Sequence, residues 1–123
     1  MLKLMLLAGV GGFFGTCARF LINKFFLTFS SWSLPIATFT INIIGCFLFG
    51  LISGMLSQHN IISPKTNAFI LVGFCGGFTT FSTFGSESLS LLNSGQIFTS
   101  IAYMGTSVVL GLLAVALGLA ISR

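Results

Sequence analysis

Residues 73–86 read GFCGGFTTFSTFGS, from Gly73 to Ser86, and combine four glycines with five serine or threonine residues. This composition makes a poor helix, yet the stretch falls at the middle of an apolar segment, residues 66–92, that is long enough to cross a bilayer. Unwound backbone at membrane depth is tolerated only inside protein or beside a water-filled cavity. We therefore predict a third membrane helix that is broken at mid-span. The alternative is an irregular but unbroken helix that serves packing alone.

The composition of the whole chain is typical of an integral membrane protein. Of its 123 residues, 55% are apolar and only 5% are charged, against about 25% charged residues in an average soluble domain. The mean hydropathy is +1.12. These values exclude a soluble enzyme and a disordered tail. The net charge of +4 comes from basic residues scattered from Lys3 to Arg123, so the chain has no patch that would bind nucleic acid.

Four apolar segments predict an all-α membrane protein, a single four-span domain over residues 1–123. We expect the spans at about residues 4–26, 34–56, 66–92 and 97–121. Polar turns separate them, including residues 30–33, where Trp32 would lie at interface depth. Four helices are too few to enclose a pathway comfortably, so we expect a multi-pass homo-oligomer in the cell membrane, which is the inner membrane if the source is Gram-negative.

The basic residues are nearly balanced between the two sides of the membrane. Four spans place Lys3, Lys65 and Arg123 on one side and Lys24 on the other, towards which Arg19 can extend. The positive-inside rule therefore gives only a weak preference. Such a chain can insert both ways, and two oppositely oriented copies would form an antiparallel, dual-topology homodimer.

Small residues recur at helical spacing on three of the predicted spans. They are Ala8, Gly12 and Thr16 in the first, Cys46, Gly50 and Gly54 in the second, and Gly111, Ala114 and Gly118 in the fourth. Such faces let helix backbones approach closely and predict a bundle rather than a pore. The three cysteines of the chain lie within apolar runs with no histidine or carboxylate at ligand spacing, so we interpret them as packing residues.

Polar side chains inside the spans mark a candidate ion path. Asn42 follows Pro35 by seven residues, which places it ~10 Å into the bilayer, and Thr38 shares its helix face. An unpaired amide costs several kcal/mol in an apolar medium, so Asn42 must face protein or water. The alternative is a hydrogen bond that only holds two helices together. In the fourth span, Tyr103 and Ser107 share a face and would extend a polar track.

Phe81 and Phe84 lie just past the predicted break and share a helix face, with Ser82 and Thr83 between them. Aromatic residues in a membrane span usually serve packing, and this chain has 15 phenylalanines. A phenyl ring has a positive edge, however, and edges turned into a pathway would favour a small anion without trapping it. The only carboxylate, Glu87, falls late in this segment, where we expect a vestibule or interface position.

Three motifs resemble those of the Fluc (CrcB) fluoride channel family. Residues 11–19 (GGFFGTCAR) resemble its first-span motif, residues 38–47 (TFTINIIGCF) its second, and residues 73–84 (GFCGGFTTFSTF) its third and most specific. The fourth span matches weakly. The departures are mild: this chain has Thr16 where the family often has Ala, Phe20 where Tyr is common, and Ala37 where Gly is common.

The resemblance implies a passive fluoride-selective channel, not an enzyme, that confers fluoride resistance by letting accumulated fluoride leave the cell. It implies an antiparallel dimer with two pores, a structural sodium ion at the dimer centre, and no nucleic-acid partner. By motif, the backbone carbonyls of Gly76 and Thr79 would hold that sodium.

The resemblance also assigns the candidate fluoride pathway. Phe81 and Phe84 would line the pore, with Asn42 as a polar pore residue near them. Ser82, Thr83 and Tyr103 would lie along the polar path. Thr38, which shares the helix face of Asn42 by spacing, belongs to the same candidate path. Arg19 would make the aqueous vestibule electropositive.

Two other functions are weighed against a fluoride channel. A proton-coupled small multidrug exporter has the same size and topology, but it needs a carboxylate deep in the bilayer. The first span here has none, and Glu87 lies late in the third. A holin-like structural pore former would not require a glycine-threonine-phenylalanine break at mid-span.

Overall fold

The structure is a computed structural model that describes residues 1–29 and 34–123. Its elements are α1 (Leu2–Phe29), α2 (Ile36–Gln58), α3 (Pro64–Thr66), the π-helix η1 (Asn67–Cys75), α4 (Gly76–Phe78), α5 (Ser82–Asn93) and α6 (Ile97–Ser122). The all-α fold class is therefore confirmed. The turn predicted at residues 30–33, with Trp32, lies outside the described residues.

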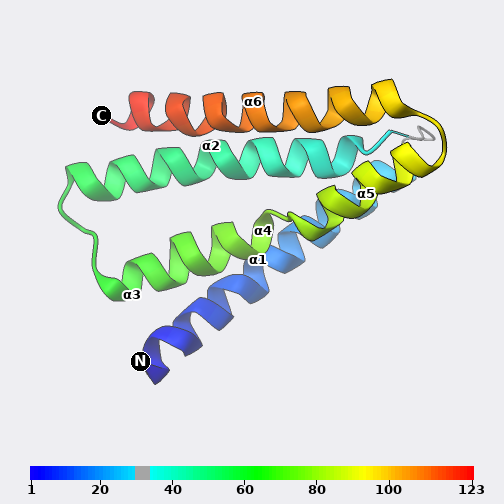
Figure 1. Ribbon diagram of the computed structural model, residues 1–123. Helices are drawn as coiled ribbons and strands as arrows, with labels where there is room; N and C mark the ends of the chain where they lie inside the picture. Colours follow the sequence, from blue (N-terminus) through cyan, green and yellow to red (C-terminus); the bar gives the residue numbers. More distant parts are fainter. Residues whose placement is uncertain (30–33) are drawn as a thin grey trace.

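Within the residues that the structure describes, four helical segments are long and apolar enough to cross a membrane: Leu2–Phe29, Ile36–Gln58, Pro64–Asn93 and Ile97–Ser122. The third contains α3, η1, α4 and α5 in succession. Helices α2 and α6 lie side by side, whereas α1 packs against η1 and α4, and α5 turns towards α6 (Figure 1). The described chain thus consists of two helix pairs that α5 connects.

Small residues allow the backbones of α2 and α6 to touch. A methyl group added at Gly118 of α6 would lie 2.6 Å from the backbone nitrogen of Leu51, closer than real side chains approach. Gly50 of α2 is packed equally tightly, because a methyl group added there would clash with the backbone of Val115. The predicted small-residue face of the fourth span is buried throughout.

The contact of α1 with the third span uses two adjacent faces of α1. Gly12, which the sequence places on the small-residue face, has its carbonyl oxygen 2.7 Å from a methyl group built at Gly77. The residues of α1 that are buried, however, are Gly11 and Gly15, one position earlier. The face is offset because the π-helix carries the backbone of the third span directly over these two glycines.

The third span is broken between α4 and α5. Thr79 has an extended backbone (φ −81°, ψ 160°), and α5 begins only at Ser82. The break predicted at mid-span is therefore confirmed, and the unbroken alternative is wrong. The π-helix before it was not predicted: the N–H of Gly76 bonds to the carbonyl of Leu71, five residues earlier. Such π turns often occur at functional sites.

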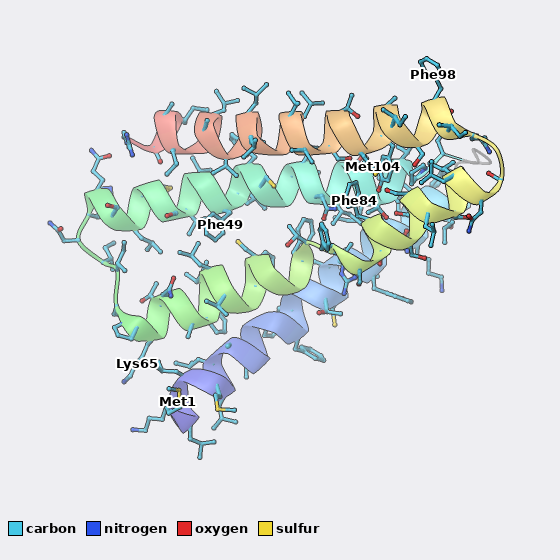
Figure 2. The ribbon with its side chains drawn as sticks, viewed as in Figure 1. Met1, Phe49, Lys65, Phe84, Phe98 and Met104 are labelled. Carbon is cyan, nitrogen blue, oxygen red and sulfur yellow. The ribbon has the colours of Figure 1, made fainter. Side chains whose placement is uncertain are left out.

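A single copy of this chain has a thin interior. In the 18-residue apolar stretch of each span, only 11% to 28% of the residues are buried. Large apolar side chains point outward instead, as Phe98 does at 91% exposure (Figure 2). These faces suit lipid, or a second copy of the chain, rather than water.

Candidate functional site

Asn42 of α2 pairs with the backbone at the break. Its Nδ2 donates to the carbonyl of Thr80 at 2.9 Å, and its Oδ1 accepts from the N–H of Thr80 at 2.8 Å. This reciprocal pair fixes the orientation of the amide. If the amide were flipped, its NH2 group would face the N–H of Thr80 and its oxygen would face the carbonyl of Thr80. One hydrogen of Nδ2 remains for another acceptor. Asn42 therefore pairs with both backbone groups of Thr80 at the break and still offers a donor.

The hydrogen bonds at the break leave two carbonyl groups without their helical partners. In a continuous helix the N–H of Thr80 would bond to the carbonyl of Gly76, but here it bonds to Asn42. The N–H of Thr83, which would bond to the carbonyl of Thr79, bonds instead to Thr80 Oγ1 at 3.4 Å. Gly76 and Thr79 are the two residues whose carbonyls were predicted to bind a cation.

Arg19 of α1 also reaches the third span. Its Nε donates to the carbonyl of Gly77 at 3.1 Å, and its side chain is half-buried. The guanidinium thus satisfies the carbonyl that lies next to Gly76. The predicted role of Arg19 in an electropositive vestibule stays a prediction.

A cavity of about 260 Å³ opens beside the break. Its walls come from α2, the break, α5 and α6, and consist of Asn42, Cys46, Thr79, Thr80, Phe81, Phe84, Ser107 and Val108. The rings of Phe81 and Phe84 lie with their centroids 5.8 Å apart and their planes tilted by 48°. The structure therefore brings Asn42 and the aromatic pair to one cavity, which mixes apolar surface with a few hydrogen-bonding groups.

Ser107 contributes an unpaired hydroxyl to this cavity. Its Oγ is buried and has no hydrogen-bond partner within residues 1–29 and 34–123. A buried polar atom without a partner is costly. The hydroxyl of Ser107 is thus available to water or to an ion in the cavity.

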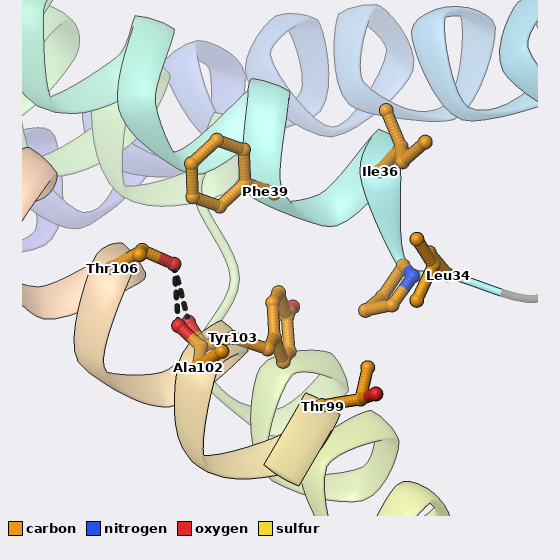
Figure 3. Close-up of a pocket in the computed structure, with 8 residues that line it drawn as sticks. Leu34, Ile36, Phe39, Thr99, Ala102, Tyr103 and Thr106 are labelled. Carbon is orange, nitrogen blue, oxygen red and sulfur yellow. Dashed lines mark hydrogen bonds between the residues drawn. The ribbon is translucent and has the colours of Figure 1, made fainter. Parts of the chain in front are cut away.

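Tyr103 lies next to the cavity and is engaged on both sides. Its ring contacts Phe84, with centroids 5.1 Å apart, and its hydroxyl donates to Oε1 of Glu87 at 3.2 Å. Figure 3 shows another, mostly apolar pocket, which Tyr103 itself lines, between α6 and the start of α2. There the hydroxyl of Thr106 donates to the carbonyls of Ala102 and Tyr103, so it adds no free donor to a polar track.

Other predicted site residues lie outside the cavity beside the break. Ser82 and Thr83 are exposed on the first turn of α5, where the hydroxyl of Thr83 accepts from Thr80 Oγ1 at 3.2 Å. Thr38 is buried at 4% exposure, one turn before Asn42 on α2. Their assignment to the fluoride pathway stays a prediction.

Sequence reasoning missed several members of the cavity. The sequence marks Thr80 only as one residue of the third motif, yet both of its backbone groups bond to Asn42. Cys46 was interpreted as a packing residue, and Val108 was not singled out. Helical spacing could have found Cys46, which lies four residues after Asn42 and so on the same face.

A separate cavity, of about 240 Å³, is lined by Gly76 and Thr79 together with Cys46 and Cys75, among other residues. Carbonyl oxygens suit a hard cation such as sodium. Within residues 1–29 and 34–123, no group of three His, Cys, Asp or Glu side chains is placed to hold a metal ion. The carbonyl oxygens of Gly76 and Thr79, which lack their helical partners, are thus ligands of a suitable kind for a small hard cation.

Comparison with known proteins gives consistent matches over nearly the whole chain. The family model described as "CrcB-like protein, Camphor Resistance (CrcB)" matches residues 6–119. A relative from Methylobacillus flagellatus is 42% identical over 93% of this chain and 90% of its own length. Relatives from Chlorobium phaeobacteroides and Flavobacterium psychrophilum are 45% and 41% identical, over 89% and 99% of this chain and 84% and 98% of their own lengths.

All three relatives are named "Fluoride-specific ion channel FluC". With four helices that can span a membrane, this chain is a multi-pass cell membrane protein. It belongs to the CrcB family of ion channels.

Proposed function

We propose that this protein is a passive, fluoride-selective channel that lowers cytoplasmic fluoride by letting the ion leave the cell. The observation that carries the proposal is the cavity at the break, where Asn42 meets Phe81 and Phe84. Relatives named as fluoride-specific channels support the choice of ion. The protein carries out transport rather than chemistry, and so it is not an enzyme.

The cavity offers fluoride a set of weak donors in place of its water. The second hydrogen of the Asn42 amide and the free hydroxyl of Ser107 would donate to the ion. The edges of Phe81 and Phe84 add weak positive potential without a full charge. A pathway of this kind admits an anion and also releases it, as conduction requires.

The polar groups at the break require a cover that lipid cannot provide. Gly76 is exposed in a single copy, and Phe81 is 80% exposed. Free carbonyls and hydroxyls cost several kcal/mol each when they face hydrocarbon. A second copy of the chain would cover this surface. The near balance of basic residues between the two sides favours an antiparallel partner.

A sodium ion at the centre of this dimer fits the donors that the chain provides. Gly76 and Thr79 would supply two carbonyls from each chain, and both carbonyls lack their helical partners. When bound, the ion would supply positive charge that offsets part of the cost of holding anions nearby. Asn42 would contribute indirectly, because it takes the N–H that would otherwise occupy the carbonyl of Gly76.

A proton-coupled exporter is not favoured. Its mechanism needs a carboxylate that trades protons for cations deep in the bilayer. Glu87, the only carboxylate of the chain, lies on α5 and accepts a hydrogen bond from Tyr103.

Purified protein in liposomes is expected to release fluoride passively and to retain chloride. Efflux is measured with a fluoride or chloride electrode after a potassium ionophore removes the membrane potential, with the same pH on both sides. Protein-free liposomes provide the control. Equal chloride flux, or fluoride flux only in a proton gradient, would refute the proposal.

Replacing sodium with a bulky organic cation is expected to weaken the dimer or the fluoride flux, because such a cation does not fit between small carbonyl groups. Both quantities are measured after extensive dialysis, by cross-linking and by efflux. Potassium substitution is the control for ionic strength. A parallel dimer, or indifference to sodium in both assays, would contradict the proposed centre.

A further inference from the structure

A basic groove lies at the opposite end of the third span from Glu87. It has a volume of about 360 Å³ and is lined by Lys3, Leu6 and Leu7 of α1 and by Lys65 of α3. The starts of these two helices lie together at one end of the molecule, where Met1 and Lys65 are labelled in Figure 2. Two cations from separate helices thus converge on one groove.

Within a single copy of the chain, no acidic side chain lies near the positive charge of this groove. Both lysine side chains are exposed. The sequence contains a single acidic residue, Glu87, which lies on α5 beyond the break. No carboxylate side chain of the same chain is therefore placed to pair with Lys3 and Lys65, so their charge is open to anions from outside the chain.

The depth of the groove matches the boundary of a lipid bilayer. Lys3 lies at the start of the span Leu2–Phe29, and Lys65 at the start of the span Pro64–Asn93. These positions correspond to the headgroup region. Leu6 and Leu7 lie about one helical turn, or ~5 Å, further along α1, at the level where acyl chains begin.

We propose that this groove binds one anionic phospholipid, with its phosphate between Lys3 and Lys65 and an acyl chain against Leu6 and Leu7. Lysine binds phosphate as a point charge. A zwitterionic lipid carries its own cation, which competes for the same phosphate, so the groove would select a headgroup with net negative charge. The site is separate from the cavity at the break and does not depend on which ion the channel conducts.

The test is the association of spin-labelled phosphatidylglycerol with the full-length protein in phosphatidylcholine vesicles, relative to spin-labelled phosphatidylcholine. The unmodified chain is expected to prefer phosphatidylglycerol. Lys3→Gln and Lys65→Gln should each lower this preference about fivefold, the effect of one basic residue at an anionic surface, and the double variant should abolish it. Replacing both lysines with arginine should preserve it.

The matched control is Lys24→Gln, which removes the same charge from the other end of α1, where Lys24 lies over the ring of Phe20 at 6.0 Å. It should leave the preference unchanged. An equal loss in Lys24→Gln would show diffuse surface attraction and overturn the proposal, as would an unchanged preference in both single variants. Displacement of the labelled lipid by soluble glycerol phosphate would show a site for free phosphate, not lipid. If the double variant assembles poorly, the fivefold loss expected in each single variant decides the outcome.

Discussion

Phe81→Ile and Phe84→Ile are each expected to lower fluoride efflux roughly tenfold, since losing ~1.4 kcal/mol of interaction with the positive ring edge raises the barrier by one factor of ten in rate. Isoleucine keeps apolar bulk but has no quadrupole. The two rings are tilted by 48°, with centroids 5.8 Å apart, at one wall of the cavity. Efflux from liposomes with matched protein content measures the effect.

The fold is expected to survive both changes. Phe81 is 80% exposed in a single copy, so its replacement leaves no cavity within the chain. Phe84 contacts Tyr103, and an apolar substitution there should cost less than a few kcal/mol. Cross-linking of the dimer and size-exclusion chromatography distinguish lost conduction from lost assembly.

Other phenylalanines provide matched controls. Phe98→Ile removes a ring that is 91% exposed on α6, and Phe69→Ile and Phe74→Ile remove rings before the break. All three should conduct within about threefold of the parent, because none lines the cavity beside the break. Parental flux in both Phe81→Ile and Phe84→Ile would mean that the pair serves packing and that Asn42 and the hydroxyls carry the anion.

The break was predictable because its cause is local. Glycine and threonine weaken a helix wherever they concentrate, and the structure interrupts the third span at Thr79, within that stretch. The partner of the break was not predictable in the same way. Asn42 and Thr80 are 38 residues apart, and no periodicity connects them. The sequence indicated that Asn42 needed a partner but did not indicate which one.

The π-helix escaped prediction for a related reason. Residues 67–75 form an apolar run. Nothing in their pattern shows whether each N–H bonds to the carbonyl five residues earlier, as in a π-helix, or four residues earlier, as in an α-helix. Its position against α1 is a tertiary feature: a methyl group added at Gly73 would lie 2.7 Å from the carbonyl oxygen of Ala8. Adjacency in sequence also has limits. Ser82 and Thr83 lie between the two phenylalanines, yet both are exposed on α5, outside the cavity.

Asn42→Ala is expected to abolish the sodium response as well as most of the fluoride flux. The change removes both part-buried hydrogen bonds to Thr80, and the carbonyl of Thr80 that loses its partner costs about 1 kcal/mol. The N–H of Thr80 is then free to bond to the carbonyl of Gly76, which restores helical structure across the break and occupies a carbonyl proposed to bind the cation. Thermal unfolding and efflux, each in sodium and in an organic cation, measure the two effects.

Asn42→Asp separates the two roles of this side chain. Aspartate keeps an oxygen that can accept from the N–H of Thr80, so the break and the sodium response should persist, although its other oxygen repels the carbonyl of Thr80 and should lower the thermal stability. It loses the amide donor and adds negative charge at the cavity wall, so fluoride flux should fall at least as far as in Asn42→Ala. Asn23→Ala, an exposed change on α1, is the control for asparagine loss and should match the parent. If Asn42→Ala keeps both flux and sodium response, the glycines and threonines of the third span hold the break by themselves. The amide of Asn42 then only joins two helices.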